Sequence, residues 1–238
     1  MNTHPARWAL AVALAIGVAS PPAVAETEKK IVAPAGPTVT KKVLSFGLAG
    51  VAFGQNLKDL TDAVGRLLDE DYKPLYAKVS PGVKMKQLDA ALAEEKAAFT
   101  RSLVKYEGLT IDTGPLKGEH GHNTNEAKLL LTRKGTTHHF FLIHGKLWKV
   151  INEQRLGEKE PAGASFGDAV QKLTKDLGAG RARPADPTKG LPFAEVDWRD
   201  TTTHLRAMDR GPILALAYEE LATLDNIVQL RAQKGFVK

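Results

Sequence analysis

The strongest constraint on the fold is an internal repeat. Residues 53–65 (FGQNLKDLTDAVG) align without a gap on residues 166–178 (FGDAVQKLTKDLG), and both fit the pattern F-G-x-x-[LV]-x-x-L-T-x-x-[VL]-G. Apolar residues fall at offsets 0, 4, 7 and 11, which is the spacing of one face of an amphipathic helix. The final glycine stands where a left-handed residue ends a helix. Each copy is therefore predicted to form one helix with one buried face.

Short apolar runs joined by turn residues follow each predicted helix. The runs are residues 128–132, 136–143, 147–152, 193–198, 202–208 and 213–219. Such runs are typical of an antiparallel meander. We therefore predict the α+β class, with two repeats that each place a helix on a small antiparallel sheet. Apolar residues in 221–231 have helical spacing and predict a helix. The alternative is a strand that continues from Ile213.

The first repeat is longer than the second because of an insertion at about residues 75–125. The helix copies are 113 residues apart and the two Thr-Thr-His sequences are 66 apart, which leaves 47 extra residues in the first half. Ser80 and Pro81 are predicted to begin a second helix, as its cap and first residue. That helix is expected to run to about Lys105 and to be the longest in the chain. Residues 69–71 are predicted to end the first helix.

The amino-terminal segment has the pattern of an export signal. Arg7 precedes an apolar run at residues 8–18, which is shorter than the roughly 20 residues that span a bilayer. The sequence Ala-Val-Ala at residues 23–25 offers a small-x-small cleavage site. We expect cleavage after Ala25 and a soluble periplasmic or secreted protein, with ordered structure starting near Val43. The expected divisions are a signal peptide (1–25), a flexible leader (26–42), a first repeat (43–157) and a second repeat (158–238).

Composition narrows the classes of function. The chain has no cysteine, which excludes a disulfide scaffold, a thiolate zinc site, a cysteine nucleophile and a lipidated cysteine. Its 33 Lys and Arg are interleaved with 27 Asp and Glu, without the aromatic ladder of single-strand nucleic-acid binders. We expect no nucleic-acid partner, no lipid anchor and no transmembrane span after signal cleavage. Some basic residues could contact an anionic surface, although we favour their interpretation as ordinary solvated surface. They are Lys84, Lys86, Arg101, Lys105, Arg231, Lys234 and Lys238.

The repeat also carries a family resemblance. A helix that ends in L-T-x-x-[VL]-G, followed by a meander with a tryptophan strand and present twice in an exported chain, resembles the beta-lactamase-inhibitor-like fold. That group includes the small outer-membrane assembly lipoproteins of the SmpA/OmlA type. The chain departs from it in lacking a lipidation cysteine and in its insertion, and Pro184 follows Gly178 closely whereas only Pro74 follows Gly65. The family motif carries no catalytic residues. The resemblance implies a protein-binding role in the cell envelope.

An enzymatic alternative centres on Ser165. This residue lies in a G-x-S-x-G motif, and Asp197, Asp200 and His204 follow in the serine, acid, histidine order of α/β-hydrolases. That motif needs a buried strand before it and a parallel sheet, whereas this chain has a polar, proline-containing segment and meanders. Ser165 also fits a helix cap paired with Asp168. We therefore expect a non-enzymatic protein and keep a secreted serine hydrolase as the alternative.

A second alternative is a metal-binding module at His120 and His122. These histidines are two residues apart in a glycine-rich segment, and they lack the i, i+4 spacing of H-E-x-x-H. Two imidazoles alone make an incomplete site, so a solvated polar loop is favoured and no cofactor is expected. His138 and His139 are neighbours on a predicted strand, so they point to opposite faces.

The aromatic residues leave two interpretations open. Trp148 and Trp198 stand in predicted strands, where one interpretation places them in the core. The other interpretation makes them, together with Tyr218, binding anchors on an exposed sheet face. Our leading hypothesis is an exported, non-enzymatic α+β protein. It would bind another envelope or secreted protein through its sheets or its inserted helix.

Overall fold

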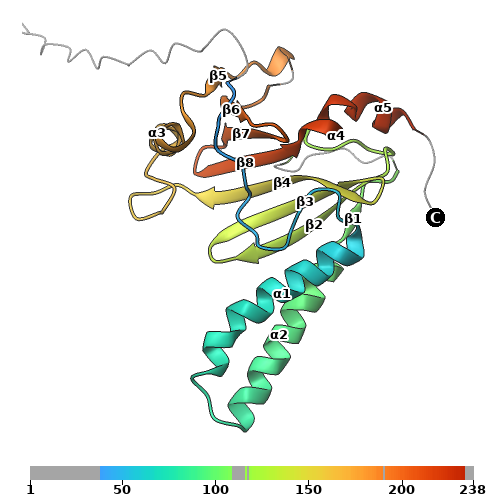
Figure 1. Ribbon diagram of the computed structural model, residues 1–238, viewed down its shortest axis with the longest axis vertical. Helices are drawn as coiled ribbons and strands as arrows, with labels where there is room; N and C mark the ends of the chain where they lie inside the picture. Colours follow the sequence, from blue (N-terminus) through green and yellow to red (C-terminus); the bar gives the residue numbers. More distant parts are fainter. Residues whose placement is uncertain (1–37, 109–115, 117, 190, 234–238) are drawn as a thin grey trace, which may run out of the picture. The chain divides into compact units, whose positions relative to one another are not determined.

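A computed structural model describes residues 38–108, 116, 118–189 and 191–233 (Figure 1). These residues belong to one compact unit, Val32–Lys238. Within them, an eight-stranded antiparallel sheet and five α-helices confirm the predicted α+β class. The strands are β1 (Val104–Lys105), β2 (Glu126–Arg133), β3 (Thr136–Ile143), β4 (Lys146–Arg155), β5 (Arg181–Arg183), β6 (Glu195–Arg199), β7 (Thr203–Asp209) and β8 (Ile213–Glu220). The helices are α1 (Leu57–Tyr76), α2 (Val83–Arg101), α3 (Phe166–Leu177), α4 (Leu221–Asp225) and α5 (Ile227–Ala232).

Two antiparallel meanders meet at the centre of the sheet. The strand order is β1-β2-β3-β4-β8-β7-β6-β5, so the strands follow in chain order inward from each edge. β4 and β8 pair there, with Lys149 opposite Glu219. Each of the six predicted apolar runs contains a strand, although β6 begins at Glu195 and not at Phe193. The turn from β2 to β3 has positive φ at Lys134 (50°) and Gly135 (77°), which is the type I′ geometry that suits a two-residue hairpin.

The second copy of the repeat forms α3 with the predicted boundaries. Ser165 is its N-cap, because the Ser165 Oγ accepts a hydrogen bond from the Asp168 backbone N–H at 3.2 Å. The Asp168 carboxylate accepts one from the Ser165 backbone N–H at 3.1 Å, which completes a capping box. Gly178 follows the last helical residue with φ of 86°, a conformation that glycine adopts without strain.

The first copy of the repeat has different boundaries. Asn56 caps α1, and the helix continues through Gly65 to Tyr76, so the predicted ends at Gly65 and at residues 69–71 are wrong. A glycine inside a helix costs about 1 kcal/mol relative to alanine, which is less than the packing of further apolar residues returns. The buried stripe continues beyond Gly65 at Leu67, Leu68 and Tyr72.

The inserted segment forms α2, which makes a helical hairpin with α1 (Figure 1). The helix begins after Gly82 and not after Ser80, and it ends at Arg101 and not near Lys105. At 19 residues it is shorter than α1 with 20, so the prediction that it is the longest helix is wrong. Lys105 belongs instead to β1, because its backbone pairs with the edge of β2.

Helices cover both faces of the sheet. On one face, α1 and α2 pack over β2–β4, and α3 packs over β6–β8. On the other face, Leu224 and Ile227 of the short helices α4 and α5 pack against Phe141, Ile151 and Met208. The carboxyl-terminal segment is therefore helical, and the alternative of a strand continuing from Ile213 is wrong.

Pairing with the sheet begins earlier in the chain than the sequence indicates. Val39 forms an isolated parallel bridge with Arg199, and the Thr40 backbone N–H donates to the Arg199 carbonyl at 2.7 Å. The end of the expected leader is therefore tied to β6. The expected signal peptide lies outside the described residues. Among the described helices, none combines the length and the apolarity needed to cross a bilayer.

Candidate binding site

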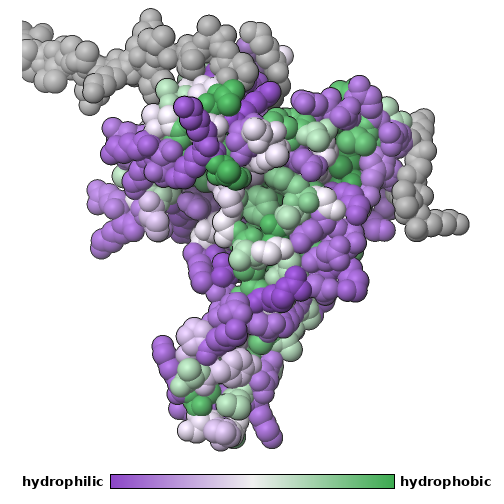
Figure 2. Space-filling model, viewed as in Figure 1, coloured by the Kyte–Doolittle hydropathy of each residue, from purple (hydrophilic) through white to green (hydrophobic). Residues whose placement is uncertain are grey.

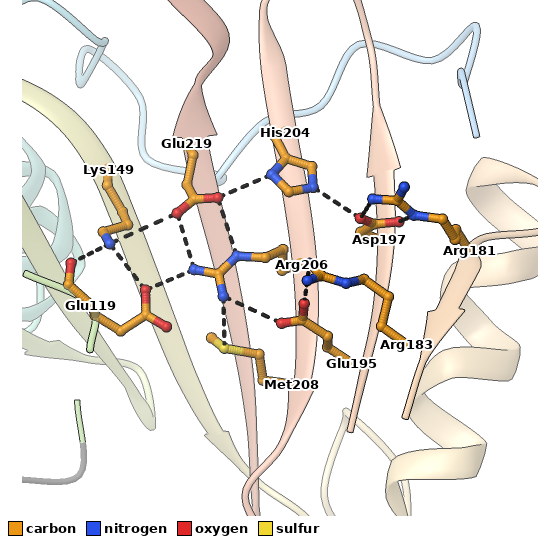
Figure 3. A network of polar contacts seen from close by, with 10 residues as sticks. All are labelled: Glu119, Lys149, Arg181, Arg183, Glu195, Asp197, His204, Arg206, Met208 and Glu219. Carbon is orange, nitrogen blue, oxygen red and sulfur yellow. Dashed lines mark hydrogen bonds and ion pairs between the residues drawn. The ribbon is translucent and has the colours of Figure 1, made fainter. Parts of the chain in front are cut away.

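One side of β4, β6, β7 and β8 carries a network of ionisable side chains (Figure 3). On the strands, this network consists of Lys149, Asp197, His204, Arg206 and Glu219. Strand register places these residues together: Lys149 and His204 each stand opposite Glu219, and Arg206 stands opposite Asp197. Directly opposed residues share one side of an antiparallel sheet. Cations and anions therefore alternate across the four strands.

Arg206 is the centre of this network. Its guanidinium donates to three carboxylates: to Glu119 at 2.7 Å, to Glu219 at 3.0 and 3.1 Å, and to Glu195 at 3.3 Å. The Arg206 side chain is 15% exposed, and the three glutamate side chains are at most 10% exposed. A planar group with five N–H donors suits such a cluster of acceptors.

Lys149 supports two of the same carboxylates. Its Nζ lies 3.0 Å from the Glu119 carboxylate and 3.8 Å from that of Glu219. The ammonium also stands 4.5 Å from the Trp148 ring centroid and 5.0 Å from that of Phe141. Aromatic faces attract a cation, which offsets part of the free energy of burying it.

Cationic neighbours hold Glu119 and Glu219 in the charged form. Burial by itself raises the pKa of Glu119, but Lys149 and Arg206 outweigh burial and lower this pKa to about 2. Burial likewise opposes the lowering of the Glu219 pKa, which Arg206 and His204 bring well below its ordinary value. A carboxylate with a strongly lowered pKa is a weak base.

His204 bridges two of these carboxylates. Its Nδ1 lies 3.0 Å from Glu219 Oε2, and its Nε2 lies 3.2 Å from Asp197 Oδ2. Burial lowers the pKa of His204, but the hydrogen bonds to Asp197 and Glu219 outweigh burial and raise it above 6.5. Burial raises the pKa of Asp197, whereas His204 and Arg181 bring it down to about 2. The two carboxylates therefore favour the imidazolium form of His204.

A cavity of about 200 Å³ opens beside the network, and we call it the charged cleft. Lys149 and Arg206 contribute charged groups to it, whereas Phe193, Leu224 and Ile227 contribute apolar walls. Trp148 also lines the cleft, and its buried Nε1 has no hydrogen-bond partner among the described residues. Cavities for drug-sized ligands measure roughly 300–1,000 Å³, so the charged cleft suits a single side chain.

The residues of the predicted serine hydrolase do not form a triad. The Ser165 hydroxyl donates to Asp168 at 2.9 Å as part of the cap of α3. Both ring nitrogens of His204 already contact carboxylates, so neither is directed at Ser165. Asp200 accepts hydrogen bonds from the backbone N–H groups of Leu44, Thr202 and Thr203. The structure thus brings His204 and Asp197 together, but it uses Ser165 and Asp200 locally.

The two histidines of the alternative metal-binding module make ring contacts with Tyr106. His120 stacks on Tyr106 with ring centroids 3.5 Å apart, and His122 meets the same ring edge-on at 5.7 Å. The part of the chain that the structure describes contains no group of three or more His, Cys, Asp or Glu residues that could hold a metal ion.

The predicted aromatic anchors are buried. Trp148 is 2% exposed, Trp198 is 0% and Tyr218 is 8%, so their interpretation as anchors on an exposed face is wrong. Trp198 and Tyr218 pack beneath α3, and the Trp198 indole donates to the Gly178 carbonyl at 2.9 Å. Large apolar rings gain more free energy from filling this core than from solvent exposure. Among the three, Trp148 lines the charged cleft.

Local sequence patterns missed the network, although they contained one signal for it. Glu195 and Asp197 alternate on one predicted strand, and His204 and Arg206 alternate on the next, which places a charged group at every second position. Glu119 comes from an irregular segment far away in sequence, and no local pattern connects it to β7.

In comparisons with protein-family models, curated proteins and solved structures, no match to this chain was found.

Proposed function

We propose that this chain is an exported, non-enzymatic binding module, and that its charged cleft receives one side chain of another envelope or secreted protein. The observation that carries the proposal is the cleft itself: a cavity of about 200 Å³ with apolar walls over paired charges. The Trp148 ring in the wall and the Lys149 ammonium 4.5 Å from its centroid offer a partner apolar surface and charge side by side.

The charge state of the cleft favours binding over catalysis. A general base needs a pKa near the working pH, whereas Lys149 and Arg206, acting against burial, hold the pKa of Glu119 at about 2. Every carboxylate that contacts Arg206 also contacts at least one other cationic side chain. Such compensated groups can orient a polar side chain without reacting with it.

Export and the repeated architecture belong to the same proposal. The apolar run at residues 8–18 and the Ala-Val-Ala site support cleavage after Ala25, which predicts a mature chain that begins at Glu26. The inward order of strands from both edges supports a duplicated helix-plus-meander unit. The resemblance to beta-lactamase-inhibitor-like proteins supports a protein partner. Intact mass measurement of the exported chain tests the cleavage site.

Site-directed photo-crosslinking in intact cells tests the cleft. A photoreactive residue at Leu191, which lines the cleft, is expected to give one discrete protein adduct, whereas the same residue at exposed Lys159 gives none. Ile227→Trp is expected to abolish the adduct by filling the cleft from its half-buried rim. Lys159→Trp is the matched control and should leave the adduct intact.

A subtler variant examines the indole itself. Trp148→Phe keeps an aromatic ring and removes part of the cleft wall, so the affinity for the captured partner should fall about fivefold, which corresponds to about 1 kcal/mol of lost apolar contact. An adduct that persists undiminished in Ile227→Trp would show that the partner binds elsewhere.

A further inference from the structure

The end of the α1–α2 hairpin lies away from the sheet (Figure 1). Asp71 ties α1 to the β2–β3 turn through ion pairs with Arg133 and Lys134. Beyond Asp71, the cross-helix hydrogen bonds are internal to the hairpin, such as that from the Tyr76 hydroxyl to Asp89 at 2.8 Å. We define the hairpin tip as residues 73–86. The packing of the sheet does not require the side chains of this tip.

The hairpin tip is basic and contains no acidic residue. Its sequence, KPLYAKVSPGVKMK, holds four lysines and lies between Asp71 and Asp89. Lys73 pairs with Glu70 at 2.6 Å. Lys78, Lys84 and Lys86 are exposed and form no ion pair with another described residue. The tip therefore presents these three lysines to the solvent, and the Asp89 carboxylate contacts it through Tyr76.

Exposed aliphatic side chains stand among these lysines. Val83 is 74% exposed and Leu75 is 42% exposed, and Pro74, Ala77 and Pro81 are exposed beside them. Figure 2 shows hydrophobic and neutral groups gathered at the free end of the hairpin, next to strongly hydrophilic ones. Lysines that flank apolar groups are the pattern of a segment that enters the headgroup layer of a membrane.

The composition of the tip favours lipid over an acidic protein. Protein interfaces are depleted in lysine and enriched in arginine and in aromatic anchors seated in pockets. The tip has no arginine, tryptophan or phenylalanine, and its one tyrosine, Tyr76, is bonded to Asp89. Three cavities among the described residues, one of them the charged cleft, are lined by other parts of the chain. Lysines act instead as mobile point charges, which suit a diffuse anionic surface.

We propose that the hairpin tip docks on the surface of an anionic phospholipid bilayer, with Val83 entering the headgroup layer and Lys78, Lys84 and Lys86 contacting phosphates. This site is distinct from the charged cleft and does not depend on the function proposed for it. Each lysine is worth about fivefold in membrane binding, so the three together are worth about a hundredfold.

Vesicle co-sedimentation of the full chain tests this site. The wild-type chain should bind vesicles that contain phosphatidylglycerol and phosphatidylcholine more tightly than phosphatidylcholine vesicles at about 0.15 M salt. The triple variant Lys78→Gln, Lys84→Gln and Lys86→Gln should bind the anionic vesicles about a hundredfold more weakly. Both proteins carry the same amino terminus, so any contribution of that segment cancels in the comparison.

A matched charge control separates the tip from net charge. The triple variant Lys41→Gln, Lys159→Gln and Lys175→Gln removes the same charge from exposed lysines elsewhere, and it should change binding less than threefold. An equal loss in the two triple variants would overturn the proposal, and so would no loss in the tip variant. Binding of the tip to polyglutamate with no binding to vesicles would assign it to an acidic polypeptide instead.

Spin labelling supplies a readout that does not depend on affinity. Because the chain has no cysteine, Val83→Cys and Val228→Cys each provide a single labelling site, and both valines are 74% exposed. On anionic vesicles, the label at residue 83 should become accessible to a lipid-soluble relaxation agent, whereas the label at residue 228 should not. A label at residue 83 that remains accessible only to water-soluble agents would overturn the insertion.

Discussion

Removal of the Arg206 guanidinium should destabilise the protein more than any exposed ion pair could. Arg206→Met keeps most of the apolar stem of the side chain. It deletes the N–H groups that donate hydrogen bonds to Glu119, Glu195 and Glu219. Loss of one partner from a buried ion pair costs about 3–5 kcal/mol, because the remaining charge stays buried without compensation.

The structure places Arg206→Met at the lower end of this range. Lys149 still contacts Glu119 and Glu219, and Arg183 still pairs with Glu195, so each carboxylate keeps at least one cation. We expect a loss of about 3 kcal/mol in the free energy of unfolding. For a chain of this length that corresponds to a fall in Tm of roughly 6–12 °C.

Urea unfolding followed by circular dichroism measures this loss, with Arg101→Met as the control. Arg101 pairs with Glu94 on the surface, where the side chains are 61% and 67% exposed, so its removal should change stability by less than about 1 kcal/mol. Adding Glu219→Gln to Arg206→Met removes one of the buried carboxylates that has lost a cationic partner, and it should return part of the loss.

The pH dependence of the free energy of unfolding tests the assignment of Arg206 further. In the wild-type protein the stabilisation from Glu119, whose pKa is lowered to about 2, is present above its unfolded pKa near 4.5 and is lost as the pH falls toward 2. Without Arg206 that pKa rises, so the difference between the proteins should be largest near neutral pH and should shrink in acid. A loss below about 1 kcal/mol at pH 7, or a loss that grows in acid, would refute the assignment of Arg206 as the centre of the network.

Other substitutions test the remaining assignments by the same unfolding assay. Because the folded pKa of His204 is raised above 6.5, its stabilisation is present below that value and is lost as the pH rises through the folded pKa, so His204→Gln should cost more at pH 5.5 than at pH 9. Gly65→Ala should stabilise α1 by about 1 kcal/mol, since the nearest atom to the added Cβ is 3.9 Å away. Gly178→Ala should instead destabilise by about 1 kcal/mol, because its φ is 86°; opposite signs for the two glycines distinguish their positions. Ser165→Ala should cost about 1 kcal/mol through loss of the cap, and fluorophosphonate labelling of the wild-type chain at Ser165 would contradict a purely structural role.

Local patterns predicted the elements whose determinants are local. The six strand runs were found because alternating and apolar stretches ended at turn residues. The boundaries of α3 followed from Ser165 at its start and Gly178 at its end, each of which acts on its own helix terminus. Where the determinant was distant, the prediction was wrong: Gly65 has the same sequence context as Gly178, yet α1 continues because its next turns pack on other elements.

The candidate site was less accessible to sequence reasoning. Trp148, Trp198 and Tyr218 carry no local mark of burial, because core positions and exposed anchors use the same aromatic residues. The link between Arg206 and Glu119 spans 87 residues, and it exists only because β7 and an irregular segment meet at one face of the sheet.

The sequence by itself determined the α+β class, the meanders and the limits of α3, because periodicity, turn residues and caps act over a few residues. Only the tertiary structure decided that two meanders meet at β4 and β8, that α1 continues past its glycine, and that ionisable residues from separate strands form one buried network. These features depend on contacts between segments far apart in the chain, where packing and charge compensation outweigh local preference.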